Sequence, residues 1–287
     1  MTKHHAHTLL LLLALAACRA PQPLFIVSDR TAENTFTSNC EGPQCDSAGN
    51  FYAVNFQKDG TVGIMRPGAP PEVFLELPTG SLANSIRFDS RGDMLLADVS
   101  GHNILKVNMK TREVSTLCHD DRFNQPNDLT VSSANVIYAS DPNWNDGTGQ
   151  IWMISPDGKP TLLETDLRLP NGIELSPDGR ILYVNEFILR NVWAYDVQPD
   201  GRLANKRLLY RFPEQCLDGM KCDRAGNLYV ARWGYGAVAV LSPTGQLLRE
   251  IPTKGKRVSN VALCGKGGRT VFVTLQDRKC VEMFRVE

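Results

Sequence analysis

A short pattern that recurs six times constrains the fold of this chain more than any other feature. Each copy has a short alternating strand, a tight turn containing Gly or Asn, and an apolar strand, which is the signal of a β-hairpin. Neighbouring copies start roughly 40 to 50 residues apart, a period typical of repeat architectures. The copies begin at Glu41, Asn84, Asn127, Asn171, Asp218 and Asn260.

Each interval between copies has room for two further strands, such as 151–154 with 161–163 and 192–195 with 207–210. Four strands in a repeat of this length are typical of a β-propeller. Apolar residues alternate and do not recur at helical spacing. The sixth copy ends after three strands, and we expect residues 24–27 to supply its missing outer strand. The sequence therefore predicts an all-β, six-bladed propeller over residues 24–287, a single domain whose last blade is closed by an N-terminal strand.

The overall composition excludes one class of partner. The chain is 42% hydrophobic and 22% charged, and its 31 Lys and Arg residues balance its 31 Asp and Glu residues. A balanced charge offers no electrostatic footprint for nucleic acid. We therefore expect no nucleic-acid partner.

The N-terminal segment differs from the rest of the chain. It has a basic start at Lys3, an apolar run over residues 9–17 that is too short to span a bilayer, and the sequence Leu-Ala-Ala ending at Cys18. This resembles the lipobox of bacterial lipoproteins, in which the cysteine becomes the lipidated first residue. The resemblance implies a signal peptide over 1–17, a lipidated tether over 18–23 and no transmembrane helix. Arg19 after the cysteine favours the outer membrane, so we expect a periplasm-facing lipoprotein; a plain secretory signal is the alternative.

The first position of every copy carries a side-chain oxygen donor, and two of the six donors are carboxylates. Equivalent positions on the innermost strands of a propeller stand around its axis at similar height. Asn and Asp also favour strand ends for local reasons, which explains some of the asparagines but not Glu41. Carboxylate and amide oxygens are the ligands of a hard cation, so Ca²⁺ is the first choice and Mg²⁺ or Mn²⁺ are alternatives. Zn²⁺ is a further alternative, although it prefers histidine or thiolate, and His102 and His119 lie off the ring.

Four motifs carry a family resemblance: Glu-Gly-Pro at Glu41, NQPNDL around Asn127, LPNGIELSPDGRILYVNE around Asn171, and LDGMKCDRAGNLYVA around Asp218. With these motifs the chain resembles the senescence-marker-protein/gluconolactonase/luciferin-regenerating-enzyme-like family over nearly its whole mature length. The resemblance implies a divalent metal at the top of the central tunnel, with Glu41, Asn127, Asn171 and Asp218 as ligands. Asn84 and Asn260 complete the ring and are expected to line the cavity or orient the substrate.

The resemblance also implies hydrolysis of a lactone or related ester. Lactone opening needs a polarised carbonyl, a stabilised oxyanion and a proton acceptor for the attacking water. A bound metal can supply the first two. Among relatives the ligand corresponding to Asp218 doubles as the proton acceptor, so Asp218 is the expected base. Asp141, in YASDPNW, is the second candidate, and a loop-capping role is its alternative.

Several residues near the third copy are candidates for substrate contacts. Sugar-lactone members of the family carry an arginine two residues before the asparagine of the third blade, where this chain has Gln125, with Arg122 nearby. His119 precedes the same blade and is expected to be within reach of the cavity. Trp144, in the loop 143–149, is expected to form part of its wall. The other tryptophans, Trp152, Trp193 and Trp233, are expected to pack in the blades.

The chain has 8 cysteines, and without Cys18 the number is odd, so at least one thiol is unpaired even where disulfides form. Cys45, Cys222 and Cys264 occupy the fifth position of their copies, which is a core position. Buried free cysteine suits that position, and we predict free thiols there.

Two other functional classes compete with the hydrolase. A non-catalytic propeller of the cell envelope that binds calcium, a ligand or a protein is the main alternative, because a fold does not prove a function. Phosphotriesterase-like and strictosidine-synthase-like activities are weaker alternatives. Phosphotriesterase-like relatives carry a histidine on the inner strand of the last blade, where this chain has Ala262.

Overall fold

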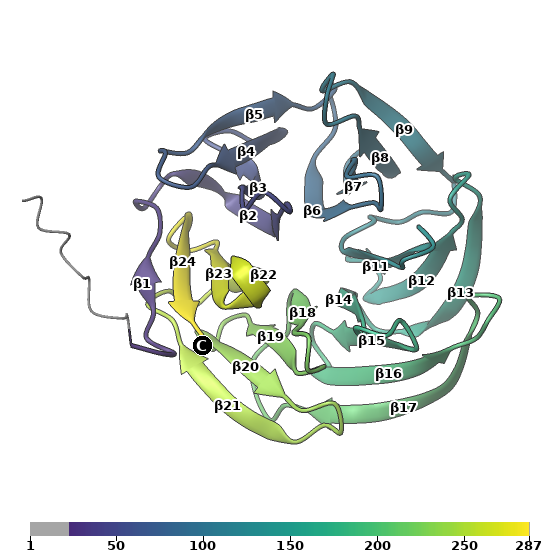
Figure 1. Ribbon diagram of the computed structural model, residues 1–287. Helices are drawn as coiled ribbons and strands as arrows, with labels where there is room; N and C mark the ends of the chain where they lie inside the picture. Colours follow the sequence, from purple (N-terminus) through teal and green to yellow (C-terminus); the bar gives the residue numbers. More distant parts are fainter. Residues whose placement is uncertain (1–22, 287) are drawn as a thin grey trace, which may run out of the picture.

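The computed structural model describes residues 23–286 and consists of six four-stranded antiparallel sheets around a central axis (Figure 1). The predicted six-bladed all-β propeller is therefore confirmed. Blades one to three are β2 (Phe36–Cys45), β3 (Phe51–Phe56), β4 (Thr61–Met65) and β5 (Glu72–Glu76); β6 (Ala83–Phe88), β7 (Met94–Asp98), β8 (Asn103–Val107) and β9 (Val114–His119); and β10 (Leu129–Val131), β11 (Ile137–Asn143), β12 (Thr148–Ile154) and β13 (Pro160–Leu167). Blades four to six are β14 (Pro170–Leu175), β15 (Ile181–Glu186), β16 (Asn191–Val197) and β17 (Leu203–Arg211); β18 (Met220–Cys222), β19 (Leu228–Arg232), β20 (Ala237–Leu241) and β21 (Leu247–Pro252); and β22 (Val258–Cys264), β23 (Thr270–Leu275), β24 (Cys280–Arg285) and β1 (Ser28–Asp29).

The recurring hairpin forms because its turn residues satisfy the backbone locally. In blade five the Asp223 carboxylate accepts hydrogen bonds from the backbone N–H groups of Ala225 and Asn227, both at 2.9 Å. Gly226 adopts φ 84°, a conformation that favours glycine. The Asp-x-x-Gly-Asn sequence thus sets the register of β18 and β19, and blade one uses the same chemistry at Asp46 and Asn50.

The hydrophobic core lies between neighbouring blades and not on the axis. One cluster joins Tyr52 and Val54 of blade one to Ile86, Met94 and Leu96 of blade two, all buried. Because apolar side chains of the alternating strands fill the spaces between blades, the axis is left to polar residues. The fold therefore presents the first residues of the six innermost strands to a central tunnel.

The N-terminal segment closes the ring, but not with the residues predicted. Its strand is Ser28–Asp29, which pairs with Met283 and Glu282 of β24, whereas the prediction placed it at 24–27. Phe25 has φ 60°, so the chain turns there, and Leu24 makes only an isolated parallel bridge to Arg285. A left-handed residue interrupts an extended strand, which is why pairing starts three residues later.

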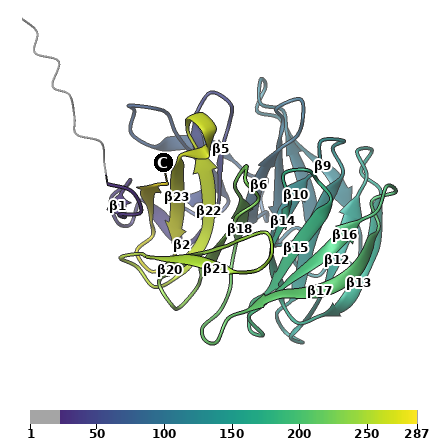
Figure 2. The ribbon, with the colours of Figure 1, turned by 60° about the horizontal axis from the view of Figure 1, so that its bottom comes forward.

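A disulfide reinforces this closure, and it corrects the prediction of free thiols. Cys45, at the end of β2, is bonded to Cys264, at the end of β22, with 5.7 Å between their Cα atoms. Figure 2 shows the strands of the first and sixth blades next to each other, where the two ends of the repeat array meet. Equivalent positions on the first and last copies become neighbours only because the ring closes. Cys222, in the corresponding position of blade five, is a free thiol as predicted.

Within residues 23–286, no helix is long and apolar enough to cross a membrane. The helical turn in this part of the chain is the 3₁₀ element η1 (Lys266–Gly268). The predicted signal peptide, Cys18 and most of the predicted tether lie outside the described residues.

Candidate metal and substrate site

The ring predicted from the repeats lies at one end of the central tunnel. A cavity of about 260 Å³ opens there. The sixth ring residue, Asn260, is buried and is not part of the lining; its side chain acts on the Glu41 carboxyl and favours the ionised form. The other five line the cavity: Glu41, Asn84, Asn127, Asn171 and Asp218.

Local backbone features aim these side chains at the axis. The pairing of β2 with β3 is irregular on both sides of Glu41, and a similar irregularity lies at Asn84 in β6. Bulges of this kind re-aim side chains and are common next to active sites. Gly42 follows with φ 57°, and a Cβ there would lie 2.9 Å from Ser85 Cα, so only glycine permits this approach of blades one and two. Glu41 thereby reaches the tunnel.

Two carboxyl groups face each other in the ring. Glu41 is 2% exposed and Asp218 is 5% exposed. The two carboxyl groups interact directly with each other, and the Asn171 side chain acts on the Asp218 carboxyl. Burial, followed by the nearby charge of Asp128, raises the pKa of Asp218 well above its usual value; burial and the charges of Asp218 and Asp128 do the same for Glu41.

Two amide oxygens beside these carboxyls are unpartnered. The Oδ1 atoms of Asn127 and Asn171 are buried and have no hydrogen-bond partner within the described part of the chain. Buried polar atoms are nearly always satisfied, so two orphaned oxygens in one cavity require an explanation. Residues 23–286 hold no group of three or more His, Cys, Asp or Glu side chains suited to a metal. The donor set here is instead two carboxylates and two amides, which fits a hard divalent cation.

A buried network of charges that was not predicted continues the tunnel beyond the ring. Arg87 Nη2 lies 3.2 Å from Asp128 Oδ1 and 3.4 Å from Glu174 Oε2. Lys221 Nζ lies 3.5 Å from Glu174 Oε2, and burial lowers the pKa of Lys221 to about 8. The sequence signal was available, because Arg87, Glu174 and Lys221 all occupy the fourth position of their copies. Charged residues there point away from the apolar spaces between blades.

The charges of the tunnel do not balance. Glu41, Asp218, Asp128 and Glu174 contribute four carboxyl groups, whereas Arg87 and Lys221 contribute two cations. Unpaired buried charge is costly, so the two remaining carboxyl groups need protons or one divalent cation. The location of the excess, at Glu41 and Asp218, coincides with the unpartnered amide oxygens.

The mouth of the cavity is aromatic on one side. Trp144 lines it, as expected from the sequence, and is joined by Phe187 and Trp233. Ring centroids are 5.3 Å apart for Trp144 and Phe187, and 5.5 Å for Phe187 and Trp233. The prediction that Trp233 packs inside its blade was therefore wrong, whereas Trp152 and Trp193 do pack in the blade cores. Trp144, Phe187 and Trp233 each directly follow the second strand of their blade, a shared position that the strand ends in the structure reveal.

Three predicted substrate contacts do not line this cavity. His119 ends β9, the outermost strand of blade two, and it borders a separate surface hollow together with Arg122. The Arg122 guanidinium is paired with Asp120 at 2.8 Å. The backbone N–H of Gln125 donates to Asp141 at 2.6 Å. These residues were predicted because they are close to Asn127 in the sequence. In the fold, however, the outermost strand β9 ends far from the axis of the propeller.

Asp141 also lies outside the cavity lining. It is fully buried, and its carboxylate accepts bonds from Asn124 N–H at 2.9 Å, Gln150 Nε2 at 2.8 Å and Trp152 Nε1 at 3.0 Å, besides that of Gln125. Burial raises the pKa of Asp141, and these donors oppose the shift. The carboxylate thus anchors the loop that leads to Asn127. This environment corresponds to the loop-capping alternative.

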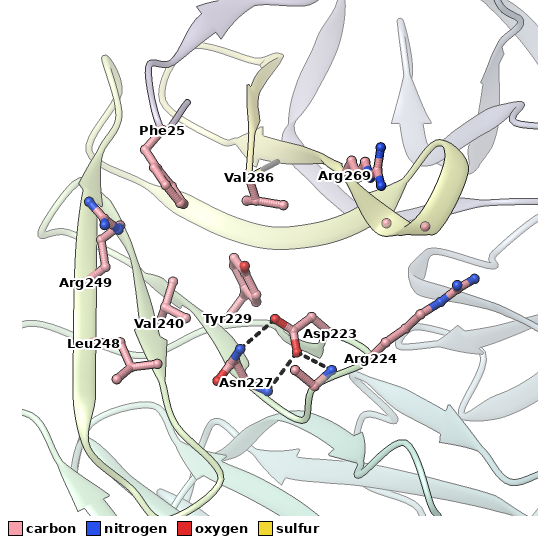
Figure 3. Close-up of a pocket in the computed structure, with 13 residues that line it drawn as sticks. Phe25, Asp223, Arg224, Asn227, Tyr229, Val240, Leu248, Arg249, Arg269 and Val286 are labelled. Atoms are coloured by element: carbon pink, nitrogen blue, oxygen red, sulfur yellow. Dashed lines mark hydrogen bonds between the residues drawn. The ribbon is translucent and has the colours of Figure 1, made fainter. Parts of the chain in front are cut away.

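A larger cavity, of about 550 Å³, lies away from the ring, between the hairpin turns of blades five and six (Figure 3). Its Asp223 is already engaged by Asn227, as the dashed lines in Figure 3 mark. The guanidinium of Arg249 covers the ring of Phe25 at 4.0 Å. None of the ring residues lines this cavity, so it is not the candidate site although it is larger.

Comparisons with known proteins agree with this geometry. The model of the SMP-30/gluconolactonase/LRE-like region matches residues 40–277. Gluconolactonase of Zymomonas mobilis is 30% identical, with 82% of this chain and 75% of that protein covered. Diisopropyl-fluorophosphatase of Loligo vulgaris is 27% identical, with 85% and 88% covered.

Solved structures confirm the architecture. Regucalcin from Agrobacterium tumefaciens, described as a calcium-binding protein, superposes with a TM-score of 0.79 at 20% identity, covering 91% of this chain and 94% of that one. A gluconolactonase from Xanthomonas campestris superposes with a TM-score of 0.77 at 23% identity, covering 90% and 88%. At these identities the likeness shows the fold alone. The match over residues 40–277, most of the chain, shows more: this chain belongs to the SMP-30/gluconolactonase/LRE-like family.

Proposed function

We propose that this protein is a divalent-metal-dependent hydrolase that opens a lactone or related ester in the cavity at the ring. The observation that carries the proposal is the set of four buried oxygen donors: the paired carboxyl groups of Glu41 and Asp218 and the unpartnered amide oxygens of Asn127 and Asn171. The names of the relatives, among them gluconolactonase and pentonolactonase, support the class of reaction.

Glu41, Asn127, Asn171 and Asp218 would hold the metal. Ca²⁺ is the first choice because all four donors are oxygens; Mg²⁺ and Mn²⁺ are the alternatives, and Zn²⁺ is less suited. The similarity to a calcium-binding regucalcin supports this order. When bound, a divalent cation supplies Lewis-acid polarisation of the carbonyl and charge to balance the oxyanion.

The side chains divide the remaining work. Asp218, which lines the cavity, accepts the proton of the attacking water, the role that the family resemblance implies for it. Asn171 acts on the Asp218 carboxyl and favours its ionised form. Asn84 lines the cavity beside Asn127, whose carbonyl it approaches at 3.4 Å, and orients the substrate. Asp141 contributes by positioning the loop that carries Asn127.

The experiment is a panel of lactones assayed after treatment with EDTA and again after Ca²⁺, Mg²⁺, Mn²⁺ or Zn²⁺ is restored. Turnover that disappears with EDTA and returns with a divalent cation supports the proposal. If no lactone is opened while Ca²⁺ still raises the melting temperature, the protein is the non-catalytic binding propeller instead.

Phosphotriester hydrolysis is a second candidate function, favoured by the similarity to the squid diisopropyl-fluorophosphatase. Ala262 replaces the histidine of such relatives on the last inner strand and argues against it. A fluoride-release assay on diisopropyl fluorophosphate, with the same metals, separates the two activities.

We also propose that the protein is a lipoprotein of the bacterial envelope, tethered through acyl chains on Cys18 and facing the periplasm. The sequence Leu-Ala-Ala-Cys and the basic start of the chain support this location. Mass spectrometry of the mature N-terminus checks it, with Cys18→Ala as the unlipidated comparison. A mature chain that retains residues 1–17 contradicts the proposal.

A further inference from the structure

We propose that the substrate is an uncharged lactone with an aromatic or other apolar substituent, rather than a polyhydroxylated or anionic sugar lactone. This inference rests on the proposed lactone hydrolysis and names the substrate class that the cavity fits. Four observations carry it: an apolar wall, the absence of a cation in the lining, the prior engagement of the polar side chains, and the size of the cavity.

The apolar wall extends over four consecutive blades. Leu82 and Val99 of blade two, Trp144 of blade three, Phe187 of blade four and Trp233 of blade five all line the cavity. Trp144 is 39% exposed, so an aromatic face is left open to the mouth. The T-shaped contact of Trp144 with Phe187 fixes both rings. Apolar surface held open in this way is suited to an apolar substituent.

The lining carries no positive charge. Of the described residues that line the cavity, the ionisable ones are Glu41 and Asp218, and none is Lys, Arg or His. Arg257 lies over the ring of Trp233 at 5.3 Å but is not part of the lining. A lactone bearing a carboxylate or phosphate would bring a further negative charge beside two carboxyl groups with no side-chain cation to receive it. Anionic lactones are therefore disfavoured.

Outside the ring, the polar side chains of the lining are engaged in protein hydrogen bonds. Asn39 Nδ2 donates to Asp59 at 2.9 Å, and Asn55 Nδ2 donates to the Asn39 carbonyl at 2.8 Å. Asn55 Oδ1 accepts from Gly60 N–H at 3.1 Å. Gln276 Oε1 accepts from Trp233 Nε1 at 3.0 Å. A polyhydroxylated lactone would bury several hydroxyl groups against side chains whose bonds are already made, and such burial costs free energy.

The size of the cavity sets the scale of the substrate. Its volume of about 260 Å³ is below the range of roughly 300–1,000 Å³ that holds drug-sized ligands. It therefore suits one lactone ring with a fused aromatic ring or a short substituent.

The test compares three lactones on the full-length protein with Ca²⁺: dihydrocoumarin as the aryl lactone, δ-gluconolactone as the neutral sugar lactone and a glucarolactone as the anionic one. We expect kcat/KM for dihydrocoumarin to exceed that for gluconolactone by roughly 10-fold or more, since an apolar group in a fitting pocket gives about 10- to 200-fold. Glucarolactone should be the poorest substrate.

Phe187→Gln tests the wall itself. It should lower the ratio of the two kcat/KM values, dihydrocoumarin over gluconolactone, by about 10-fold through KM. Phe187→Leu should restore most of the ratio. Leu208→Gln, at a position that is 50% exposed on the outer strand β17, is the matched control and should leave the ratio unchanged.

The outcomes separate this inference from the proposed function. A preference for gluconolactone, or an equal loss on both substrates in Phe187→Gln, overturns the substrate class and leaves the hydrolase intact. If none of the lactones is opened with any metal, the proposed hydrolase activity is wrong. A thermal-shift titration with the lactam analogue of dihydrocoumarin then tests, without turnover, whether the apolar wall binds an apolar ligand. Stabilisation by the lactam that Phe187→Gln removes upholds an apolar ligand; absence of stabilisation overturns it.

Discussion

The carboxyl groups of Glu41 of blade one and Asp218 of blade five interact directly in the cavity at the axis of the propeller. Two ionised carboxylates at this place would repel each other and have no donor between them, so the pair is stable when one of the two groups keeps its proton. Burial of both groups favours this protonated state in the absence of a cation. A divalent cation at the same place would replace the proton and bring the unpartnered oxygens of Asn127 and Asn171 into use.

The first prediction concerns this pair. Glu41→Gln and Asp218→Asn should each lower lactone turnover by about 10²- to 10³-fold, the usual loss when a group that stabilises developing charge is removed. Both should also abolish stabilisation by Ca²⁺, which for an intact site is about 2.7 kcal/mol at 100 times Kd. Thermal unfolding in EDTA and in Ca²⁺ measures the second effect.

Glu113→Gln, on the exposed edge of blade two, removes the same charge away from the site and should keep both responses. Near-normal turnover in Asp218→Asn would show that another group accepts the proton. A normal stabilisation of Glu41→Gln by Ca²⁺ would show that the metal binds elsewhere.

The blades and the ring could be predicted because each depends on local sequence. A hairpin with an Asp-x-x-Gly-Asn turn forms from contiguous residues, and equivalent first residues meet at the axis by the symmetry of the repeat. The features that were missed depend on closure of the ring. Cys45 and Cys264 become neighbours only when copies one and six meet. Proximity in the sequence was misleading in another case: Arg122 is near Asn127 in the chain but borders a different hollow.

The aromatic wall was only partly predictable for another reason. Trp144 was predicted from the loop 143–149, whereas Phe187 and Trp233 were not, although all three directly follow the second strand of their blades. The turns inside the copies differ in length, so the three positions do not align when copies are written from their first residues. Only the strand ends in the structure reveal that the three are equivalent.

The second prediction distinguishes a structural from a catalytic role for Asp141. Asp141→Asn would place an amide N–H₂ group among N–H donors from Asn124, Gln125, Gln150 and Trp152. Leaving buried donors unsatisfied costs about 1–3 kcal/mol each, so urea unfolding should show a clear loss of stability. Turnover per folded molecule at low temperature should stay within a few-fold of wild type. A loss as large as that of Asp218→Asn, with stability unchanged, would make Asp141 the base.

The third prediction concerns the disulfide between blades one and six. Cys45→Ser, or reduction of the wild type, should lower the free energy of unfolding by about 2–5 kcal/mol, the usual cost of losing a native disulfide. Turnover at low temperature should persist, because neither cysteine lines the cavity. Cys222→Ser, at the equivalent free position, is the control: it keeps the disulfide and should lose stability on reduction as the wild type does, whereas Cys45→Ser should not respond to reductant. Equal stability of oxidised and reduced protein would show that β-strand pairing at Ser28–Asp29 suffices to close the ring.

The fourth prediction is a pH dependence set by Lys221. Burial lowers its pKa to about 8, against about 10.4 in an unfolded chain. Between these values the unfolded state binds more protons than the folded state, so the contribution of Lys221 to stability rises with pH, by at most roughly 1.4 kcal/mol per unit. Denaturant unfolding from pH 7 to 10 should show wild type gaining stability relative to Lys221→Met over this window. The exposed Lys110→Met should follow wild type throughout. Parallel curves for wild type and Lys221→Met would mean that the carboxylates of Glu174 and Asp128 hold the ammonium at its ordinary proton affinity.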